Sequence, residues 1–263
     1  MVNVNNQRNS LHVSDIKIVS LNVCGLCSKL RTPDFLEFIN EHDIVCLTET
    51  KTDCADVIDV ENYTVISKHR SNLSSHKSGG IVVYVRNTLS KFVSLITNEC
   101  DHVLWIRVKK DVVHLYEDLI IGTIYIPPVN SRYSSLEIFD ELEREIVTFS
   151  TVTECICLIG DFNSRVACEK DYFDLVDFEN PVLDDNILRN ACSSNDFMEL
   201  QKYGFFVDRE SNDKTINQYG KKLINICKNC NIFILNGRSK HDKNGAYTCK
   251  SSSVVDYCIA SVS

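Results

Sequence analysis

Short apolar segments, many of them β-branched, alternate with polar turns along most of the chain. This pattern predicts strands over residues 16–23, 43–49, 63–68, 80–87, 102–109, 118–126, 155–161, 231–237 and 253–260. Several of these segments precede the second predicted helix and are joined by short turns. That order favours two stacked sheets of mixed or antiparallel strands over one doubly wound parallel sheet.

A helical repeat of apolar positions marks fewer segments. One helix is expected to begin at Pro33, with Thr32 as its cap, because proline fits the first turn of a helix. A second helix begins near Ser134 and a third near Asn217. Their apolar faces would be formed by Leu136, Phe139, Leu142, Ile146 and Phe149 in the second helix, and by Leu223, Ile224 and Cys227 in the third.

Residues 165–216 show a weaker pattern and are rich in aspartate, asparagine and serine. We expect them to form a long acidic loop region on the rim of the domain, with a short helix near residues 196–203. Loops of this length are uncommon without a function, so a substrate-facing role is expected. The chain is predicted to fold as one domain over residues 15–263, preceded by a disordered leader over residues 1–14.

The length of 263 residues and the hydrophobic content of 44% suffice for a packed core, which excludes a disordered chain. No apolar run reaches the roughly 20 residues that cross a bilayer. The polar N-terminal segment MVNVNNQRNSLHVSD lacks the apolar stretch of a secretory signal. We therefore expect an intracellular protein, nuclear or cytoplasmic, that is neither secreted nor held in a membrane.

Charge and cysteine content limit the expected partners. The formal net charge is -8, which argues against attraction of nucleic acid by the overall field, so any contact with a polyanion must be local. The thirteen cysteines are odd in number, which favours a reducing compartment. The two CxxC pairs, Cys24 with Cys27 and Cys227 with Cys230, lie too far apart in the sequence for a zinc ribbon, so no structural zinc is expected.

Candidate chemistry lies at the ends of the predicted strands. Five apolar runs carry, or end in, an isolated amide, carboxylate or phenol. The residues concerned are Asn22, Glu49, Tyr125, Asp161 with Asn163, and Asp256. Side chains two apart on a strand face the same way, so Asp161 and Asn163 are expected to point at one target while Phe162 packs behind them.

Each of these residues taken alone also has a structural explanation. Asn22 could cap a turn, Glu49 could be a solvated strand end, and residues 160–164 could form a plain turn. Asp256 is harder to explain in this way, because a carboxylate among apolar neighbours is costly to bury without a partner. Together, the oxygen donors suit Mg²⁺ or Mn²⁺, with Glu49 and either Asn22 or Asp256 as ligands. Such a site supports in-line attack of water on a phosphodiester or phosphomonoester.

The same residues lie in motifs that resemble those of the endonuclease/exonuclease/phosphatase superfamily. The motifs, in chain order, are LNVCGL, LTETK, KSGGIVVYV, IYIPP, GDFNSR and SSVVDYCIAS. LNGR followed by AYTC and SSVVDY most resembles the endonuclease domain of non-LTR (LINE-type) retrotransposons. The resemblance covers about residues 16–263, and GDFN followed downstream by DY is its more specific part.

The resemblance implies a fold and a set of roles. The fold would be α/β (α+β), a DNase-like four-layer sandwich of two packed, mostly antiparallel β-sheets flanked by helices. Glu49 would bind the metal with Asn22 close by in the same site, and Asp256 would support the metal or the attacking water.

The resemblance further implies that Asp161 orients or deprotonates the attacking water, while Asn163 and Tyr125 hold the scissile phosphate. The sequence departs from the family in one respect. No SDH-like motif follows the DY, and none of the seven histidines stands in such a motif. Removal of one transition-state donor costs about 10² to 10³ in rate. We therefore expect a fragment that lacks the C-terminal strand, exposes the neighbouring sheet edge and has little or no turnover.

Basic side chains near the expected active face are candidates for contacts with DNA phosphates. They are Lys68, Arg70, Lys77, Arg165 and Arg238. A lone surface charge is more often only solvated, which is the alternative for most of them. The densest cluster is KHRSNLSSHK over residues 68–77. With a net charge of -8, the expected binding to DNA is weak and strongly dependent on salt.

Three functions are compatible with these observations. The first is a Mg²⁺-dependent DNA endonuclease of retroelement origin that nicks its target. The second is a phosphatase of the same fold that acts on a small phosphorylated substrate such as an inositol phosphate. The third is a non-catalytic interaction protein that retains the fold. The sequence carries no signal for an oligomeric state.

Overall fold

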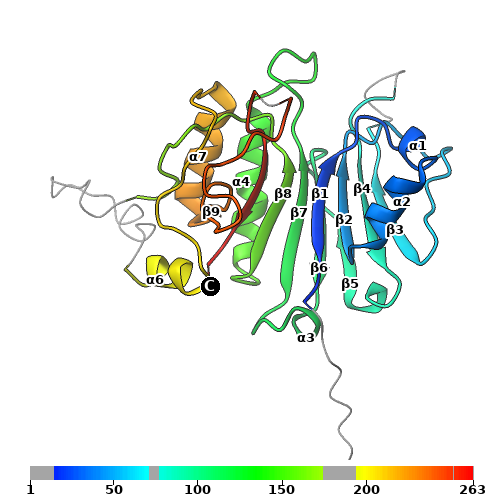
Figure 1. Cartoon of the computed structure of the whole chain (residues 1–263), viewed down its shortest axis with the longest axis horizontal. Coiled ribbons are helices and arrows are strands. Elements are labelled where there is room, and N and C mark those ends of the chain that lie inside the picture. The colour runs from blue at the N-terminus through cyan, green and yellow to red at the C-terminus, as the bar shows by residue number, and fades with distance from the viewer. Residues whose placement is uncertain (1–14, 71–76, 174–193, 251, 263) are drawn as a thin grey trace, which may run out of the picture.

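Two β-sheets form the centre of the protein (Figure 1). The computed structural model describes residues 15–70, 77–173, 194–250 and 252–262, so the predicted leader over residues 1–14 lies outside the described residues. The four-stranded sheet has the order β1-β2-β4-β3, and the six-stranded sheet has the order β5-β6-β7-β8-β10-β9.

The four-stranded sheet contains the parallel pair β1 and β2, and β4 pairs with β2 and β3 in antiparallel register. Its strands are β1 (Ile18–Asn22), β2 (Ile44–Thr48), β3 (Tyr63–Lys68) and β4 (Ile81–Arg86). In the six-stranded sheet β7 and β8 are parallel and the other neighbours are antiparallel. Its strands are β5 (Val93–Ile96), β6 (Val103–Val108), β7 (Leu119–Tyr125), β8 (Ile156–Asp161), β9 (Phe233–Ile234) and β10 (Asp256–Ala260).

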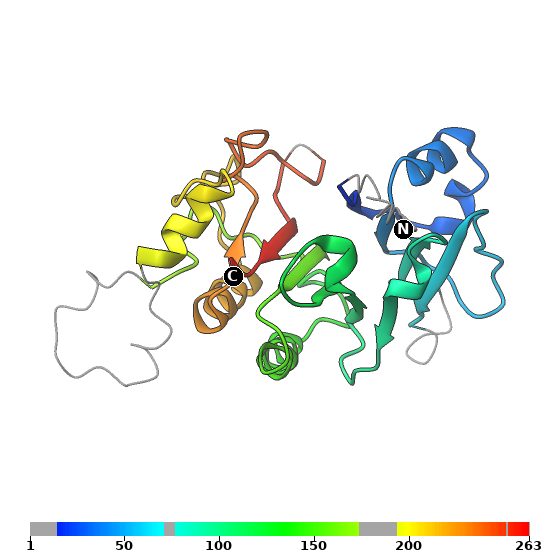
Figure 2. The ribbon, with the colours of Figure 1, turned by 90° about the horizontal axis from the view of Figure 1, so that it is seen from below.

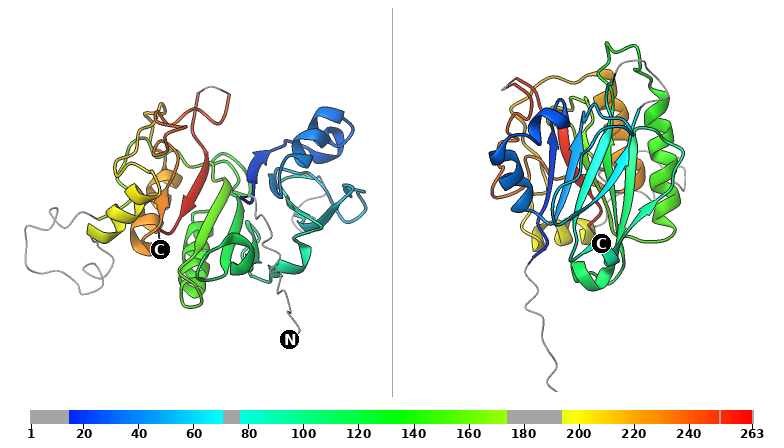
Figure 3. Two further views of the ribbon diagram at one scale, coloured as in Figure 1. Left: turned by 60° about the horizontal axis from the view of Figure 1, so that its bottom comes forward. Right: turned by 90° about the vertical axis from the view of Figure 1, so that its right-hand side faces the viewer.

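Helices cover the outer face of each sheet, which completes a four-layer sandwich. The described helices are α1 (Leu26–Lys29), α2 (Pro33–Asn40), α3 (Lys110–Val113), α4 (Glu137–Ser150), α6 (Ser194–Lys202) and α7 (Gln218–Cys230), with a 3₁₀ turn at Ser90–Phe92. Figure 2 shows α4 and α7, in green and orange, on the side of the molecule opposite blue α2. The right panel of Figure 3 shows the same separation of α2 from α4.

Alternation along the strands sorts the apolar side chains between the layers. In β2, Val45 and Leu47 pack toward α2, while Ile44 and Cys46 pack between the two sheets. The core between the six-stranded sheet and its helices is larger, and it includes Trp105 from β6 and Phe139 from α4. The fold class expected from the sequence is therefore confirmed, with mixed rather than parallel sheets.

Several predicted elements begin and end close to the expected residues. The helix at Pro33 begins there, and Asn217 caps α7 because its side chain accepts a hydrogen bond from the Gly220 backbone N–H. The helix expected near Ser134 begins later, at Glu137. Ser134 instead donates its N–H to the Ser131 carbonyl, which makes this segment a turn.

Other elements differ from the prediction. The strand expected over residues 231–237 is only Phe233–Ile234, because the Asn236 side chain takes over the pairing with β10. That amide donates to the Asp256 carbonyl and accepts from the Cys258 N–H. The short elements α1, α3 and β5 were not predicted. Of the described helices, none is long and apolar enough to cross a bilayer.

Candidate functional site

The predicted polar residues gather where strands of both sheets end. Asn22 is the last residue of β1, and Glu49 follows the last residue of the parallel strand β2. In the other sheet Tyr125 and Asp161 are paired last residues of the parallel strands β7 and β8. Asp256 begins the antiparallel strand β10 opposite Asp161. Parallel neighbours end at the same sheet edge, so this topology brings distant residues together.

Two hydrogen bonds join the sheets at this edge. The Asn22 side chain donates from Nδ2 to Asp161 Oδ2 at 2.8 Å. The Tyr125 hydroxyl donates to Glu49 Oε1 at 3.3 Å. Each bond links a residue of the four-stranded sheet to one of the six-stranded sheet, so Glu49 and Asp161 lie in one site.

Asn163 belongs to the same site but points differently from the prediction. The strand ends at Asp161, and Asn163 has φ +47°, so simple strand alternation does not continue to it. Its backbone N–H donates to Asp161 Oδ1 at 2.9 Å, and its side-chain Nδ2 donates to the Ile126 carbonyl at 2.8 Å. Phe162 is fully buried behind this turn, as expected.

Left-handed backbone conformations surround the site. Cys24, Glu49, Lys51 and Asn163 all have φ between 47° and 52°. Non-glycine residues in this region are strained, and such strain concentrates at functional sites. Backbone hydrogen bonds from Gly25 to the Glu49 carbonyl and from Lys51 to the Gly79 carbonyl hold these loops in place.

The carboxylates of the site share one electrostatic environment. Burial, with a further contribution from the Asp256 charge, raises the pKa of Asp161 to about 7. Burial also raises the pKa of Asp256, and the Glu49 charge adds to that rise. A carboxyl group whose pKa lies near neutrality can exchange a proton with water at physiological pH.

These residues fit a hard divalent cation with few protein ligands. Within the described residues, no group of three or more histidine, cysteine, aspartate or glutamate side chains is placed to hold a metal ion. Mg²⁺ needs only one or two carboxylates, because it keeps several waters and takes substrate phosphate as a ligand. Burial, and to a lesser extent the neighbouring carboxylates, disfavour the charged forms of Asp161 and Asp256, and a cation held by Glu49 and Asn22 or Asp256 would offset that cost.

Two polar residues support the site that were given no catalytic, metal-binding or DNA-binding role from the sequence, although Lys51 was expected near the active face. Lys51 lies 3.6 Å from Glu49 Oε2 and donates to Cys24 Sγ at 3.2 Å. Thr248 Oγ1 accepts the backbone N–H groups of Val255 and Asp256, which fixes the start of β10. Both lie within the motifs LTETK and AYTC, so the sequence contained a signal for them.

Of the five basic residues expected to contact DNA, Arg238 and Arg165 each form a bidentate ion pair with one aspartate. Arg238 is only 1% exposed and pairs with both oxygens of Asp171, at 2.6 and 2.7 Å. Its guanidinium is therefore structural, which corrects the expectation of a DNA contact. Arg165 makes a similar two-pronged pair with Asp213, at 2.6 and 2.7 Å.

The remaining three basic residues lie on or next to the segment KHRSNLSSHK. Lys77 pairs with Asp53 and Asp56. Lys68 is half-buried, and its ammonium donates to Asn98 Oδ1 and to the carbonyls of Cys100 and Val103. Arg70 packs against Tyr125 beside the site.

No histidine side chain of the described residues forms a hydrogen bond with the six strand-end side chains. The His42 ring bonds to the Phe38 carbonyl, His69 bonds to Thr52 and Ser67, and His102 bonds to Arg70. His12 and His76 lie outside the described residues.

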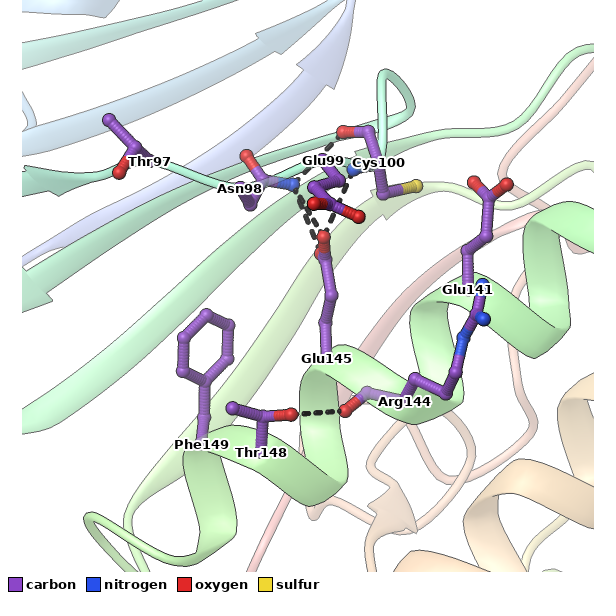
Figure 4. Close-up of a pocket in the computed structure, with 9 residues that line it drawn as sticks. All are labelled: Thr97, Asn98, Glu99, Cys100, Glu141, Arg144, Glu145, Thr148 and Phe149. Carbon is purple, nitrogen blue, oxygen red and sulfur yellow. Dashed lines mark hydrogen bonds between the residues drawn. The ribbon is translucent and has the colours of Figure 1, made fainter.

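A separate pocket of about 420 Å³ lies between α4 and the loop before β6 (Figure 4). Glu145 projects into this region and accepts hydrogen bonds from Asn98 Nδ2, the Cys100 N–H and Trp105 Nε1. These bonds tie the loop to α4. None of the six strand-end residues lines this pocket.

Solved structures share this architecture at low sequence identity. The 3′ phosphatase NExo from Neisseria superposes with a TM-score of 0.53 and 13% identity, covering 94% of this chain and 86% of that one. The endonuclease domain of TRAS1, a telomere-specific non-LTR retrotransposon, gives 0.51 and 10%, covering 94% and 85%. An AP endonuclease from Archaeoglobus fulgidus gives 0.52 and 15%, covering 94% and 86%. These likenesses show the DNase-like fold.

A search of curated proteins finds no match. The sequence profile of the Endonuclease/Exonuclease/phosphatase family, by contrast, matches residues 19–207, which is more than half of the chain. That segment contains five of the six strand-end residues, and Asp256 joins them through its pairing with Asp161. The chain belongs to the endonuclease/exonuclease/phosphatase family, whose members are metal-dependent phosphodiester hydrolases that generally use Mg²⁺.

Proposed function

We propose that this chain is a Mg²⁺-dependent DNA endonuclease of the non-LTR retrotransposon type, which nicks its target strand. The observation that carries the proposal is the pair of bonds between the sheets, from Asn22 to Asp161 and from Tyr125 to Glu49. They gather an acid, an amide, a phenol and a second acid in one site, and these groups can bind a divalent cation, orient water and donate hydrogen bonds to a phosphate.

The proposed roles follow from where each group lies. Glu49, with Asn22 or Asp256, would hold the cation, which supplies charge stabilisation at the phosphate when it is bound. Asp161 is fixed by the Asn22 amide and by the Asn163 N–H, so one carboxylate is aimed from two sides. It would orient the attacking water and accept its proton.

The phosphate would be held by neutral donors. Tyr125 contributes a hydroxyl at the Glu49 edge of the site, and the Asn163 side-chain amide, which also donates to the Ile126 carbonyl, would contribute its second N–H. Donors aimed at the charge that develops on the phosphate stabilise the transition state without prior reorganisation.

Support for DNA as the substrate comes from proteins of the same fold. One is described as the endonuclease domain of a retrotransposon, and the NExo structure is described as bound to a product DNA hairpin. The NExo description as a 3′ phosphatase also supports the alternative, removal of a terminal phosphate from a phosphorylated substrate.

Nicking of supercoiled plasmid tests the proposal and separates it from the alternative. We expect the protein to convert supercoiled to open-circular DNA slowly with Mg²⁺, because no described histidine side chain donates to the site, and to stop when the metal is chelated. Glu49→Ala and Asp161→Asn should abolish nicking, while the exposed helix carboxylate variant Glu37→Gln should leave it unchanged. Release of inorganic phosphate without nicking would support the phosphatase instead. Nicking that survives both site substitutions would reject the proposed site.

A further inference from the structure

We propose that Arg70 is a positioning residue, which holds the Tyr125 ring so that its hydroxyl stays aimed into the catalytic site. This inference rests on the proposed function, because it assigns Arg70 a task within the same site. It replaces the earlier expectation that Arg70 contacts the DNA backbone.

The Arg70 guanidinium lies among three side chains beside the site. Its Cζ atom is 5.7 Å from the centre of the Tyr125 ring and 4.9 Å from the centre of the Tyr133 ring. Its Nη2 atom lies 3.1 Å from His102 Nδ1, where it can donate to the neutral imidazole. A planar guanidinium can stack on aromatic faces and donate hydrogen bonds at its edge at the same time.

Arg70 also differs from two other basic residues that were expected to contact DNA, because both of those bind carboxylates. Lys77 and Arg165 are paired with carboxylates. Among the described residues, no carboxylate forms an ion pair with the half-buried Arg70. Among the described residues, its close side-chain contacts are the two aromatic rings and His102, and these contacts fix where its charge lies.

Gly79 confines the Tyr125 ring from another direction. A Cβ atom at Gly79 would lie 3.0 Å from Tyr125 Cε1 and 3.1 Å from Arg70 Nη1, so both side chains pack directly on the backbone there. Gly79 also has φ +62°, which favours glycine. The Tyr125 backbone N–H donates to the His102 carbonyl, so His102 contacts both partners of the pair.

The consequence concerns the direction of the Tyr125 hydroxyl. The ring is 7% exposed, and its hydroxyl reaches Glu49 at 3.3 Å. Without Arg70, one face of the ring loses its neighbour, and the ring can rotate or shift away from Glu49. Small displacements of a positioned group carry large costs in rate, up to about 10² for roughly 1 Å.

Steady-state kinetics of Arg70→Gln test this assignment on two substrates, plasmid DNA and bis(p-nitrophenyl) phosphate. We expect kcat to fall about tenfold or more on both substrates, while KM changes less than about twofold. Arg70→Lys should recover part of the loss, since a cation remains near the ring. The matched control is Arg144→Gln on the exposed face of α4, which should behave as the wild type.

A double-substitution cycle gives the sharper test. If Arg70 acts through Tyr125, Arg70→Gln should cause no further loss of kcat in a Tyr125→Phe background. Additive losses would overturn the proposal. It would also be overturned by an effect confined to KM on DNA with a reduced salt dependence, because that pattern indicates a direct phosphate contact.

A measurement without turnover separates this proposal from the proposed function. With tyrosines labelled by ¹³C, the Tyr125 signal is assigned by its loss in Tyr125→Phe. The Tyr125 signal should shift and broaden in Arg70→Gln and stay unchanged in Arg144→Gln. If the wild type hydrolyses neither substrate, the proposed function fails. The spectrum still tests whether Arg70 positions the Tyr125 ring, because it does not depend on turnover. An unchanged Tyr125 signal in Arg70→Gln would overturn the positioning role.

Discussion

The site places carboxylates in a largely buried position, where Asp161 is 4% exposed. Asp161 lies opposite Asp256 in the sheet, and burial and the Asp256 charge both raise the pKa of Asp161. Hydrogen bonds from Asn22 and Asn163 orient its carboxylate, and no basic side chain of the described residues forms an ion pair with it. A carboxylate held in this way is suited to orient water and is costly to the fold without a metal.

Asp161→Asn should lower the nicking activity without lowering the stability of the folded protein. An amide of the same shape cannot accept the proton from water, so nicking should fall by at least about 10². Without metal the variant should unfold at the same or a higher temperature than the wild type, because a buried charge has been removed. Nicking within tenfold of wild type would contradict the role of Asp161.

His102 gives the protein a defined response to acid. Burial and the nearby Arg70 charge lower the pKa of His102 to about 4, below the value of about 6.5 for an unfolded histidine. The folded state therefore binds fewer protons than the unfolded state between these values. Stability that is present above about pH 6.5 is lost as the pH falls toward 4.

A comparison of the wild type with His102→Gln isolates this effect. The glutamine oxygen can still accept the Arg70 hydrogen bond but does not titrate. From pH 7 to pH 4, denaturant unfolding should show the wild type losing about 3 kcal/mol more than the variant. Parallel stability curves for the two proteins would contradict a buried, neutral His102.

Among the elements, the segment after β8 is fixed to β9 by one buried ion pair. The Asp171 carboxylate accepts hydrogen bonds from Nη1 and Nη2 of Arg238 and from the backbone N–H of Ile234. Arg238 Nη1 also donates to the Ile234 carbonyl. Both side chains are essentially inaccessible to solvent. Because removal of one partner leaves a buried, uncompensated charge, this pair should be sensitive to substitution.

Arg238→Met should lower the free energy of unfolding by about 3 to 5 kcal/mol, measured by denaturant titration. The matched control is Lys222→Met, which breaks the exposed pair between α7 and Asp140. That variant should cost less than about 1 kcal/mol. Equal costs for the two variants would show that the Arg238 pair is not stabilising in the way its burial indicates.

The strands that carry the site could be predicted because their signal is local. β2 and β7 are apolar runs bounded by polar residues, and Glu49 and Tyr125 stand at or just beyond their ends. By contrast, β5 is four residues long and partly exposed, so its pattern is short and weak. Whether a strand or helix could be predicted depended on the length and periodicity of its apolar pattern, and not on its importance to the fold.

The partners of the basic residues could not be predicted, because they depend on long-range packing. Arg238 meets Asp171 across 67 residues of sequence, and Lys68 meets loop carbonyls more than 30 residues away. Asn163 was misplaced for a different reason, because the strand ends at Asp161 and the backbone turns left-handed. Sequence spacing gives the residue types of the site, whereas the direction of each side chain follows from the fold.

At the scale of the whole molecule, the two sheets contribute complementary halves of the site. Glu49 and Asn22 come from the four-stranded sheet, and Tyr125, Asp161 and Asp256 come from the six-stranded sheet. The apolar layer between the sheets, which includes Tyr125 itself, fixes the separation of the two halves. A cation bound at the junction would therefore stabilise the folded protein as a whole.

The net charge of -8 limits how the molecule meets DNA. Because all five basic residues expected to contact DNA are engaged by other groups of the protein, affinity must come from other local groups and from the cation. Nicking should therefore fall steeply as salt rises, measured as initial rate between 50 and 200 mM KCl, on the order of tenfold or more. A flat salt profile would contradict an electrostatic DNA contact.

Thermal unfolding with and without Mg²⁺ tests most directly whether the six strand-end side chains form one cation site. At ten times its dissociation constant, a bound ion stabilises by about 1.4 kcal/mol, which raises Tm by about 2 to 4 °C. The wild type and the control Glu37→Gln should show this rise, and Glu49→Ala should not. No rise in the wild type, or an equal rise in Glu49→Ala, would contradict the account.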